Sequence, residues 1–467
     1  MTIQSINPAT EEVVATFEEF TPAQVDAVLE QAYTAQRRWR QTSFGERSAK
    51  LQAAARVLRA RKQDWARLIT LEMGKPIVEA EAEIDKCAWN CDFFAEKASS
   101  FLADEVVDTG ATESFVAFQP LGLVLAIMPW NFPFWQVFRF AAPALMAGNG
   151  AVLKHASNVP QCALAIEEIF ASVGLPQGLF KTLLVPGGAV DQIIADPRIA
   201  AVTLTGSSQV GEQVASAAGR HIKKQVLELG GSDPFIVLAD ADLDAAVQTA
   251  VRARNQNTGQ SCIAAKRFIV EDRVADQFTE RFAAAVRALH VGDPMQRDTN
   301  IGPLARSDLR EGVADQVRRS LEQGAHAVVG GNIRDGRGFF FEPTVLDSVR
   351  LDAPAFREEV FGPVAAVVRA RDPEEALQLA NDTDYGLGAN LWTRDTARGK
   401  EMARRIESGS VFINGMVASD PRLPFGGIKR SGYGRELGVY GIREFTNIQS
   451  IVVGSTAPAP KQTVSAE

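Results

Sequence analysis

The stretch LGLVLAIMPWNFPFWQVFRFAAPALMAGNGAVLK, residues 121–154, contains the repeating unit that decides the fold. It begins with an apolar run of strand length, continues into a helical segment (135–148) and returns to a second apolar run (150–154). Strands that alternate with helices in this way form parallel βαβ units. The alternation continues to about residue 330, so we predict an α/β fold whose ligands bind at the carboxyl ends of parallel strands.

Three other regions flank this unit. From Thr21 to about Phe101 the sequence has the periodicity of long amphipathic helices, and a second α/β stretch extends from 231 to about 430. SFVAFQP (114–120) and NIQSIVV (447–453) have the pattern of exposed strands, which we expect to pair with each other or with a neighbouring subunit. We expect the last residues, 458–467, to form a disordered tail.

The composition favours an enzyme that acts on small molecules. The 467 residues carry 57 acidic and 49 basic side chains, a net charge of −8, and no basic block that would favour nucleic acid. No apolar run approaches the roughly 20 residues needed to span a bilayer, and the N-terminus lacks the features of a signal peptide. We therefore expect a cytoplasmic protein without nucleic acid or membrane partners.

The cysteines and histidines predict neither a disulfide scaffold nor a metal site. Four cysteines in 467 residues are too few for a disulfide framework, which fits a reducing compartment. Cys87 and Cys91 lie four residues apart on one helical face, where burial explains them better than a redox pair. The four histidines lack metal-ligand spacing, so we expect no metal.

Two residues have the chemistry of a nucleophile and a base. Cys262 lies in NTGQSCIAAKR (257–267), where Gly259 suits a turn that presents a thiol at the edge of a cleft. The alternative for this lone cysteine is a small buried side chain. Glu228 follows an apolar strand and precedes a Gly-Gly turn, which directs it toward a ligand crevice. The alternative for Glu228 is a solvated strand end.

The segment MPWNFP (128–133) and the helix after it contain further candidates. Two prolines hold Asn131 in rigid, non-helical backbone, from which its amide can donate a hydrogen bond to a developing oxyanion. Trp135 and Arg139 lie four residues apart on one helical face, and an Arg can hold a carboxylate through two hydrogen bonds. The alternative for Arg139 is an ion pair with a surface Glu.

Two loops at strand ends can bind phosphate. TGSSQVG (205–211) opens a helix whose N-terminal N–H groups favour anions, but its glycine spacing does not match the dinucleotide fingerprint G-x-G-x-x-G. In VLKHASNVP (152–160), Lys154 ends a strand, and we expect Ser157 or Asn158 to cap the next helix.

Seven short motifs together resemble the aldehyde dehydrogenase family over nearly the whole chain. They are PWNFP, LKHAS, LTGSSQVG, LELGG, GQSC, EEVFGPV and PFGG, in this order and with family-like spacing. The resemblance implies a Rossmann-like cofactor-binding domain (1–101 and 121–230) and an α/β catalytic domain (231–430). It also implies a small β extension with the C-terminal segment (102–120 and 431–457), through which the family forms homodimers or homotetramers.

The same resemblance implies a role for each site residue. Cys262 would be the nucleophile that forms a thioester, Glu228 the base that activates water, and Asn131, with the Cys262 backbone N–H, the oxyanion hole. NAD(P) would contact a larger set of residues: Trp130, Lys154, Ser157, Gly206, Ser207, Gly230, Glu359 and Phe361. In this set Lys154 would bind the adenosine ribose, Gly206 and Ser207 the pyrophosphate, and Glu359 the nicotinamide ribose.

Ser157 bears on the choice of cofactor. Many NAD-preferring relatives carry Glu at this position, whose charge repels a 2′-phosphate. In this chain the repulsion is absent, and a hydroxyl beside Lys154 can hydrogen-bond the phosphate. We therefore expect NADP to be the cofactor, with NAD also accepted.

Within the family, the chain looks most like bacterial succinate-semialdehyde dehydrogenases, through ELGGSDPFIVL, NTGQSCIAAKRF, FREEVFGPVAA and VFINGMVASD. The resemblance implies that Arg139 and Ser419 bind the distal carboxylate of succinic semialdehyde. Trp135 and Phe425 would line the entrance tunnel, with core packing as the alternative for both. Some relatives have a second Arg six residues before the nucleophile, where this chain has Gln256, so we expect weaker carboxylate affinity and a broader substrate range.

Two alternatives stay open. A relative with the same fold could transfer the acyl group to phosphate or coenzyme A instead of water, which Glu228 disfavours because hydrolysis needs that base. A non-catalytic relative could keep only the scaffold. The complete set of Cys262, Glu228, Asn131 and Glu359 disfavours that second alternative.

Overall fold

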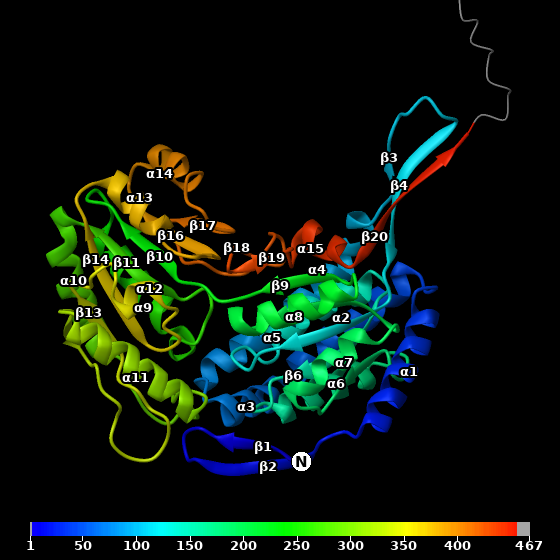
Figure 1. Ribbon diagram of the computed structural model, residues 1–467, viewed down its shortest axis with the longest axis horizontal. Helices are drawn as coiled ribbons and strands as arrows, with labels where there is room; N and C mark the ends of the chain where they lie inside the picture. Colours follow the sequence, from blue (N-terminus) through cyan, green and yellow to red (C-terminus); the bar gives the residue numbers. More distant parts are fainter. Residues whose placement is uncertain (1, 455–467) are drawn as a thin grey trace, which may run out of the picture.

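The computed structural model describes residues 2–454, so the tail expected at 458–467 lies outside the described residues. Two large sheets and a projecting ribbon of strands organise the chain (Figure 1). The first sheet has the order β19-β9-β8-β5-β6-β7. Its strands are β5 (Leu123–Met128), β6 (Gly150–His155), β7 (Phe180–Thr182), β8 (Ile199–Thr205), β9 (Lys224–Glu228) and β19 (Gly432–Tyr433).

The first sheet confirms the predicted βαβ pattern. Its neighbouring strands run parallel, except that β19 returns from the end of the chain and pairs antiparallel with β9. The connecting helices are α5 (Trp135–Met146), α6 (Pro160–Ser172), α7 (Val190–Ala195) and α8 (Ser208–Arg220). The strands β5, β6 and β8 of this sheet are largely apolar and buried, as expected for a sheet covered on both faces.

Four long helices form the layer predicted between Thr21 and Phe101. Two of them begin at capping boxes, in which Thr21 or Ser43 exchanges hydrogen bonds with the third helical residue. The longest, α4, packs against α2, α3 and α5 and so reaches the centre of the molecule. The bounds are α1 (Pro22–Trp39), α2 (Phe44–Ala60), α3 (Lys62–Met73) and α4 (Ile77–Phe101).

Two local features differ from the sequence prediction. The first residues form an antiparallel hairpin, β1 (Thr2–Asn7) with β2 (Glu12–Glu18), which the sequence did not reveal. The expected cap of α6 is wrong: its N-cap is Val159, and neither Ser157 nor Asn158 bonds to the helix end. The carboxylate of Glu72, from α3, instead accepts the first free N–H groups of α6, so the cap comes from a distant segment.

The second sheet lies beside the first and has the order β12-β13-β14-β11-β10-β16-β17 (Figure 1). Only the β12–β13 pair is antiparallel among its described pairs. The strands are β10 (Asp233–Val237), β11 (Ala265–Glu271), β12 (His326–Val329), β13 (Thr344–Asp347), β14 (Val364–Ala370), β16 (Gly388–Trp392) and β17 (Ser410–Ile413). The helices are α9 (Leu243–Asn255), α10 (Asp272–Arg287), α11 (Ser307–Glu322), α12 (Pro354–Arg357), α13 (Pro373–Asn381) and α14 (Thr396–Ala403). The short strands β15 (Tyr385–Gly386) and β18 (Ile428–Lys429) form a separate antiparallel pair.

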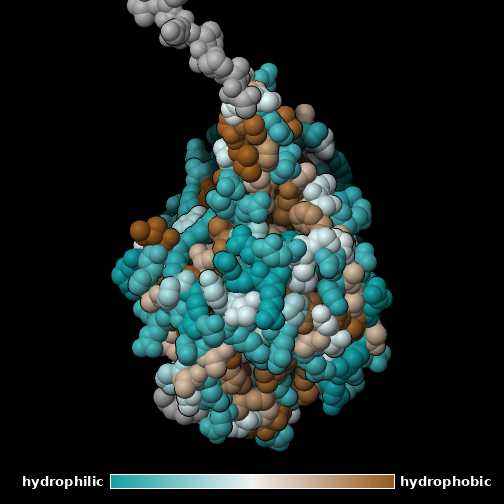
Figure 2. All heavy atoms as spheres, turned by 90° about the vertical axis from the view of Figure 1, so that its right-hand side faces the viewer, coloured by the Kyte–Doolittle hydropathy of each residue, from teal (hydrophilic) through white to brown (hydrophobic). Residues whose placement is uncertain are grey.

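A ribbon of three strands projects from the body of the molecule (Figure 1). It consists of β3 (Glu105–Val106), β4 (Glu113–Pro120) and β20 (Thr446–Val453), which follows the short helix α15 (Gly438–Glu444). The pairing of β4 with β20 confirms one of the two pairings expected for these segments. Apolar side chains gather on the ribbon (Figure 2), among them Ile448 and Val452, which are 61% and 60% exposed.

The carboxyl ends of the strands of the first sheet meet along one edge. β5 ends at Met128 opposite the end of β6 at His155, and β8 ends at Thr205 opposite the end of β9 at Glu228. The loops that leave this edge therefore bring the segments around Asn131, Lys154 and Gly206 together with Glu228. Among the helices of residues 2–454, none is both long enough and apolar enough to cross a membrane.

Candidate functional site

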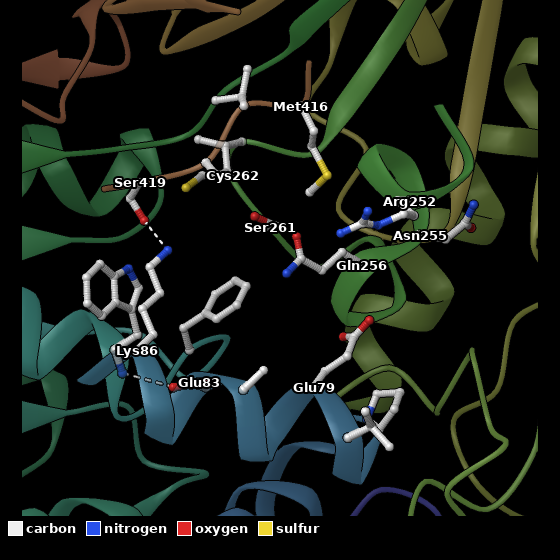
Figure 3. Close-up of a pocket in the computed structure, with 18 of the residues that line it drawn as sticks. Glu79, Glu83, Lys86, Arg252, Asn255, Gln256, Ser261, Cys262, Met416 and Ser419 are labelled. Atoms are coloured by element: carbon white, nitrogen blue, oxygen red, sulfur yellow. Dashed lines mark hydrogen bonds between the residues drawn. The ribbon is translucent and has the colours of Figure 1, made fainter. Parts of the chain in front are cut away.

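A cavity of about 700 Å³ lies between α4, α5 and the loops that carry Cys262 and Ser419 (Figure 3). Cys262 lines it from the loop before β11, and Ser419 from the loop after β17. Three other predicted residues, Trp135, Arg139 and Phe425, also line it. One cavity therefore collects the predicted nucleophile and all four residues that the sequence assigned to substrate binding.

The loop before Cys262 has an unusual backbone. Asn257, Thr258 and Gly259, in the short helical turn η2 (Gln256–Gly259), have φ angles of 56°, 55° and 74°, which side chains other than glycine rarely tolerate. A Cβ at Gly259 would lie 2.3 Å from the Gly362 carbonyl oxygen, so this position requires glycine. The strained conformation presents Cys262 to the cavity.

Half-buried Glu79 and buried Lys266 hold this loop in place. The carboxylate of Glu79, on α4, accepts a hydrogen bond from the Asn257 N–H (2.6 Å). On the other side, the Lys266 ammonium donates to the carbonyl oxygens of Ser261 (3.0 Å) and Cys262 (2.8 Å). The position of Cys262 is thus fixed by groups that the sequence reasoning did not identify.

The surroundings of Cys262 favour its thiol over its thiolate form. Burial raises its pKa to about 12, although the cations Arg139 and Lys266 oppose the shift. A thiolate is the reactive form, so the site needs a group that removes the proton. The other three cysteines, Cys87, Cys91 and Cys162, are buried free thiols.

Asn131 lies against the same loop. Its side-chain Nδ2 donates a hydrogen bond to the Gln260 carbonyl oxygen (3.1 Å), and its own carbonyl accepts one from Asn257 Nδ2 (2.7 Å). The second Nδ2 hydrogen has no partner among the described residues, and neither has the backbone N–H of Cys262. One of these donors belongs to the nucleophile itself and the other bonds to Gln260, two residues before it, and together they have the chemistry of an oxyanion hole.

Glu228 ends β9 in a buried position. Neither of its carboxyl oxygens has a hydrogen-bond partner among residues 2–454. Its Oε1 approaches the loop of PFGG so closely that a Cβ at Gly426 would lie 2.6 Å away. Burial and the neighbouring Glu436 raise the pKa of Glu228 well above its usual range. A carboxyl with a raised pKa and free oxygens is suited to accept a proton from water.

Arg139 forms an ion pair with Glu436, a residue that the sequence reasoning missed. The sequence offered an ion pair with a surface Glu as the alternative for Arg139. The ion pair is present, but both of its side chains are buried. The Arg139 guanidinium also lies 4.5 Å from the Phe425 ring centroid and donates to Thr205 Oγ1 (3.3 Å). Arg139 therefore faces the cavity with its charge already compensated.

Lys86 is a second cation in the cavity, and the sequence reasoning missed it as well. Its Nζ donates to Ser419 Oγ (2.8 Å) and lies 4.5 Å from the Trp135 ring centroid (Figure 3). Glu79, Glu83 and Lys86 follow each other at spacings of four and three residues, which places them on one face of α4. That charged stripe within a mostly buried helix was a signal that could have identified the cavity wall.

The residues expected around the nicotinamide ribose lie together. Glu359 Oε1 accepts a hydrogen bond from the Gly231 N–H (2.9 Å), and burial raises the pKa of Glu359. A Cβ at Gly230 would lie 2.4 Å from Glu359 Oε2, so the carboxylate can occupy this place only beside a glycine. Trp130 and Phe361 meet edge to face, with their ring centroids 5.8 Å apart.

The residues expected around phosphate lie at the carboxyl edge of the first sheet. Lys154 is half-buried at the end of β6, and burial lowers its pKa. Within the described residues, Lys154 forms no ion pair or side-chain hydrogen bond. Ser157, three residues later in the chain, is exposed. Ser207, after Gly206, caps α8 by accepting from the Val210 N–H. A free ammonium, a free hydroxyl and a helix N-terminus form a donor set that fits a phosphate-bearing cofactor.

The chain matches known proteins over nearly its whole length. A family model described as "Aldehyde dehydrogenase family" matches residues 1–451. The probable succinate-semialdehyde dehydrogenase NADP(+) of Synechocystis sp. is 55% identical over 451 residues, which cover 97% of this chain and 99% of the relative. Succinate-semialdehyde dehydrogenase NADP(+) 1 of Mycobacterium tuberculosis is 53% identical over 454 residues, with the same coverage of 97% and 99%.

A solved structure shows the same fold. The succinic semialdehyde dehydrogenase of Streptococcus pyogenes, crystallised in complex with NADP+, has a TM-score of 0.95 and 39% sequence identity to this chain. The match covers 97% of this chain and 100% of that structure. The fold, the motifs and these relatives agree: the chain belongs to the aldehyde dehydrogenase family and has the aldehyde dehydrogenase fold.

Proposed function

We propose that this enzyme oxidises succinic semialdehyde to succinate with NADP+ as cofactor, and that it also accepts NAD+. The observation that carries the proposal is the single cavity that holds Cys262 together with Arg139 and Ser419. The relatives named as NADP(+)-dependent succinate-semialdehyde dehydrogenases support both the substrate and the cofactor.

In the proposed reaction, the Cys262 sulfur attacks the aldehyde carbon and forms a C–S bond. The aldehyde oxygen becomes an oxyanion, which Asn131 Nδ2 and the Cys262 N–H stabilise by hydrogen bonds. The attacking species is the thiolate, so the proton of Cys262 must first leave, and Glu228 is the candidate to receive it and to release it to solvent before the hydrolytic step. When bound, NADP+ supplies the acceptor for the hydride that leaves the former aldehyde carbon.

Glu228 would complete the reaction by hydrolysis. Its carboxylate takes a proton from water, and the resulting hydroxide attacks the carbonyl carbon of the thioester. The C–S bond breaks, succinate leaves, and Cys262 recovers its sulfur as thiolate. The buried position and the free oxygens of Glu228 support this role, because its raised pKa makes the carboxylate a stronger base.

We propose that the cofactor lies along the carboxyl edge of the first sheet and reaches Cys262 past Glu359. Lys154, Ser157, Gly206 and Ser207 would hold the adenosine phosphate and the pyrophosphate. Near the nicotinamide, Glu359 would hold the ribose, and its neighbours would be Trp130, Gly230 and Phe361. Residues 1–101 and 121–230 would then form the cofactor-binding domain and residues 231–430 the catalytic domain, which the separate sheets support.

We propose that the chain forms a homodimer or homotetramer through its β extension, residues 102–120 and 431–457. The exposed apolar side chains of β3, β4 and β20 support this, because an edge ribbon with such side chains favours pairing with another chain. Light scattering on Ile448→Lys should show a smaller assembly than the unaltered protein. An unchanged mass would contradict the role of this ribbon.

We also propose a cytoplasmic location, supported by the four free cysteines. Fractionation of source cells, followed by detection of the protein with an antibody, tests this location. Recovery in a secreted or membrane fraction would contradict it.

The test of the proposed activity is a panel of aldehydes assayed with both cofactors. Cofactor reduction is followed by its near-ultraviolet absorbance, and the products are identified with and without coenzyme A. We expect succinic semialdehyde to have the highest kcat/KM in the panel, NADP+ to be preferred, and succinate to form at the same rate without coenzyme A. A higher kcat/KM for uncharged aldehydes, or a requirement for coenzyme A, would overturn the proposal.

A further inference from the structure

Lys86 brings a positive charge into the substrate cavity. The side chain extends from α4 toward Ser419 (Figure 3), to whose Oγ its Nζ donates a hydrogen bond (2.8 Å). The Trp135 ring lies against the same Nζ at 4.5 Å from its centroid, an arrangement that stabilises an ammonium. Two independent contacts thus fix the position of the ammonium within the cavity, while two of its three N–H groups have no acceptor among residues 2–454.

The acidic groups near Lys86 are engaged elsewhere. Glu83, on the same helix, forms a buried ion pair with Lys75 and accepts hydrogen bonds from the N–H groups of Phe134 and Trp135. Asp420, which follows Ser419, pairs with Arg422 at 2.6 Å. Within residues 2–454, no carboxylate lies within ion-pair distance of Lys86. Lys86 is half-buried, and a partly desolvated cation without a counter-ion is unfavourable, so the cavity favours an anion at this place.

Arg139 differs from Lys86 in this respect. Glu436 already compensates the charge of Arg139. Gln256, which lines the same cavity, is neutral. Two further cations line the cavity: Arg297 pairs with Glu81, and Arg252 is exposed to solvent. Among the described residues, Lys86 is therefore the half-buried cation of this cavity that has no carboxylate partner.

Because succinic semialdehyde carries a carboxylate at the end remote from its aldehyde group, we propose, on the basis of the function proposed above, that Lys86 is the cation that binds this carboxylate. Ser419 and Trp135 hold the ammonium in place, and the carboxylate supplies the missing counter-ion. This assignment changes the expectation that the substrate carboxylate is bound more weakly because Gln256 replaces the second Arg of some relatives. The second cation of the carboxylate site is present, but it comes from α4 and not from the segment before the nucleophile.

The surroundings of Lys86 give the proposal a pH signature. Burial and the positive charge of Arg139, on α5, lower the pKa of Lys86 to about 8, against the opposing effect of Cys87 and Glu83 on α4 and of Asp420 on the neighbouring loop. Lys86 is therefore charged below pH 8 and loses its charge above it. Because kcat/KM reports the free enzyme, its value for succinic semialdehyde should fall above pH 8 relative to its value for an uncharged aldehyde.

The test measures the ratio of kcat/KM for succinic semialdehyde to kcat/KM for butanal, from pH 6 to about 9.5, with NADP+. The ratio cancels the titration of Cys262 and Glu228, which act on both substrates. We expect Lys86→Met to lower the ratio about 10- to 100-fold at neutral pH, mainly through KM, and to remove its fall above pH 8. Lys86→Arg should keep the preference and shift the fall out of the measured range, because an Arg stays charged.

Lys97→Met is the matched control. It removes the same charge from the same helix, but Lys97 is 45% exposed and pairs with Glu96 outside the cavity, so the ratio should not change. Activity with butanal shows whether each variant folds. An unchanged ratio in Lys86→Met, an equal loss for both substrates, or a fall near pH 8 that persists without Lys86 would overturn the inference. If the unaltered enzyme itself shows no preference for succinic semialdehyde, the proposed function fails instead.

Discussion

The two ends of the reacting centre differ in how their residues are held. On the cofactor side, Lys154, Ser157 and Ser207 lie at or just beyond strand ends, each close in sequence to the motif that marks it. On the substrate side, the cavity is shaped by buried charges from distant segments, as in the contact of Arg139 with Glu436. The comparison shows that cofactor binding depends on local loop chemistry, whereas substrate binding depends on a network assembled by the fold.

Glu228 is the proposed base of the reaction, so its replacement should have the largest effect. Glu228→Gln keeps the shape but removes the base, and we expect steady-state turnover to fall about 1,000-fold or more. Mass spectrometry after mixing with substrate and cofactor should detect acyl-enzyme on Cys262 if the first half of the reaction survives. Turnover within tenfold of the unaltered enzyme would show that another group activates the water.

The next largest effect should come from the buried network. Glu436→Gln leaves the Arg139 charge unpaired in the interior, which should lower the free energy of unfolding by about 3–5 kcal/mol, as for other broken buried ion pairs. Thermal unfolding followed by circular dichroism measures the change. The matched control is Glu212→Gln, which breaks the exposed pair with Arg430 and should hardly move the midpoint. Equal shifts of the thermal midpoint in the two variants would contradict the distinction between the buried ion pair and the exposed one.

A local change at the cofactor side should leave that network intact. Ser157→Glu places a negative charge where the 2′-phosphate is expected, so the preference for NADP over NAD should fall about 10- to 100-fold. Ser157→Gln adds a similar volume without charge and separates repulsion from bulk. Both variants should keep the thermal midpoint, because Ser157 is exposed and caps no helix. An unchanged cofactor ratio in Ser157→Glu would remove Ser157 from the proposed phosphate site.

The smallest expected effect concerns Glu79, which holds the nucleophile loop. Burial raises the pKa of Glu79 to about 7 from the usual value of 4.5, so folding favours its protonated form. The ionised form of Glu79 therefore lowers the free energy of unfolding, and this effect grows as the pH rises from about 4.5 to 7. Glu79→Gln should raise the thermal midpoint by a few degrees at pH 8 and by less at pH 5. Glu96→Gln, an exposed change on the same helix, should have no such pH dependence.

The sequence predicted most of the fold because its signals are local. Apolar strand runs between 121 and 238, and the helical periodicity before Phe101, each depend on neighbouring residues and appear in the structure as expected. The β1–β2 hairpin was missed because β2 is largely exposed and because one of the two buried positions of β1 is the polar Ser5, so apolar residues do not alternate along it. The cap of α6 was assigned to the wrong residue because Glu72, its true source, lies almost ninety residues away.

The site shows the same division between local and distant signals. Cys262 and Asn131 were found through short motifs, and the structure brings their segments together. Glu436 and Lys86 lie in no motif that the sequence reasoning used. Their importance comes from what surrounds them, namely a buried partner for Glu436 and a missing partner for Lys86. Neither fact can be read before the chain has folded.

Close backbone contacts at three glycines imply that the chemistry and the selectivity can be engineered separately. Gly259 abuts the carbonyl of Gly362, Gly230 abuts the Glu359 carboxylate, and a Cβ at Gly231 would lie 2.7 Å from the Cys262 carbonyl oxygen. The nucleophile is therefore aligned with Glu359 by main-chain packing. On α4, Glu79 bonds to the nucleophile loop, whereas Lys86 bonds to Ser419 and takes no part in this alignment. Redesign of the α4 wall around Lys86 can change which aldehyde is accepted while the alignment that makes the thioester stays intact.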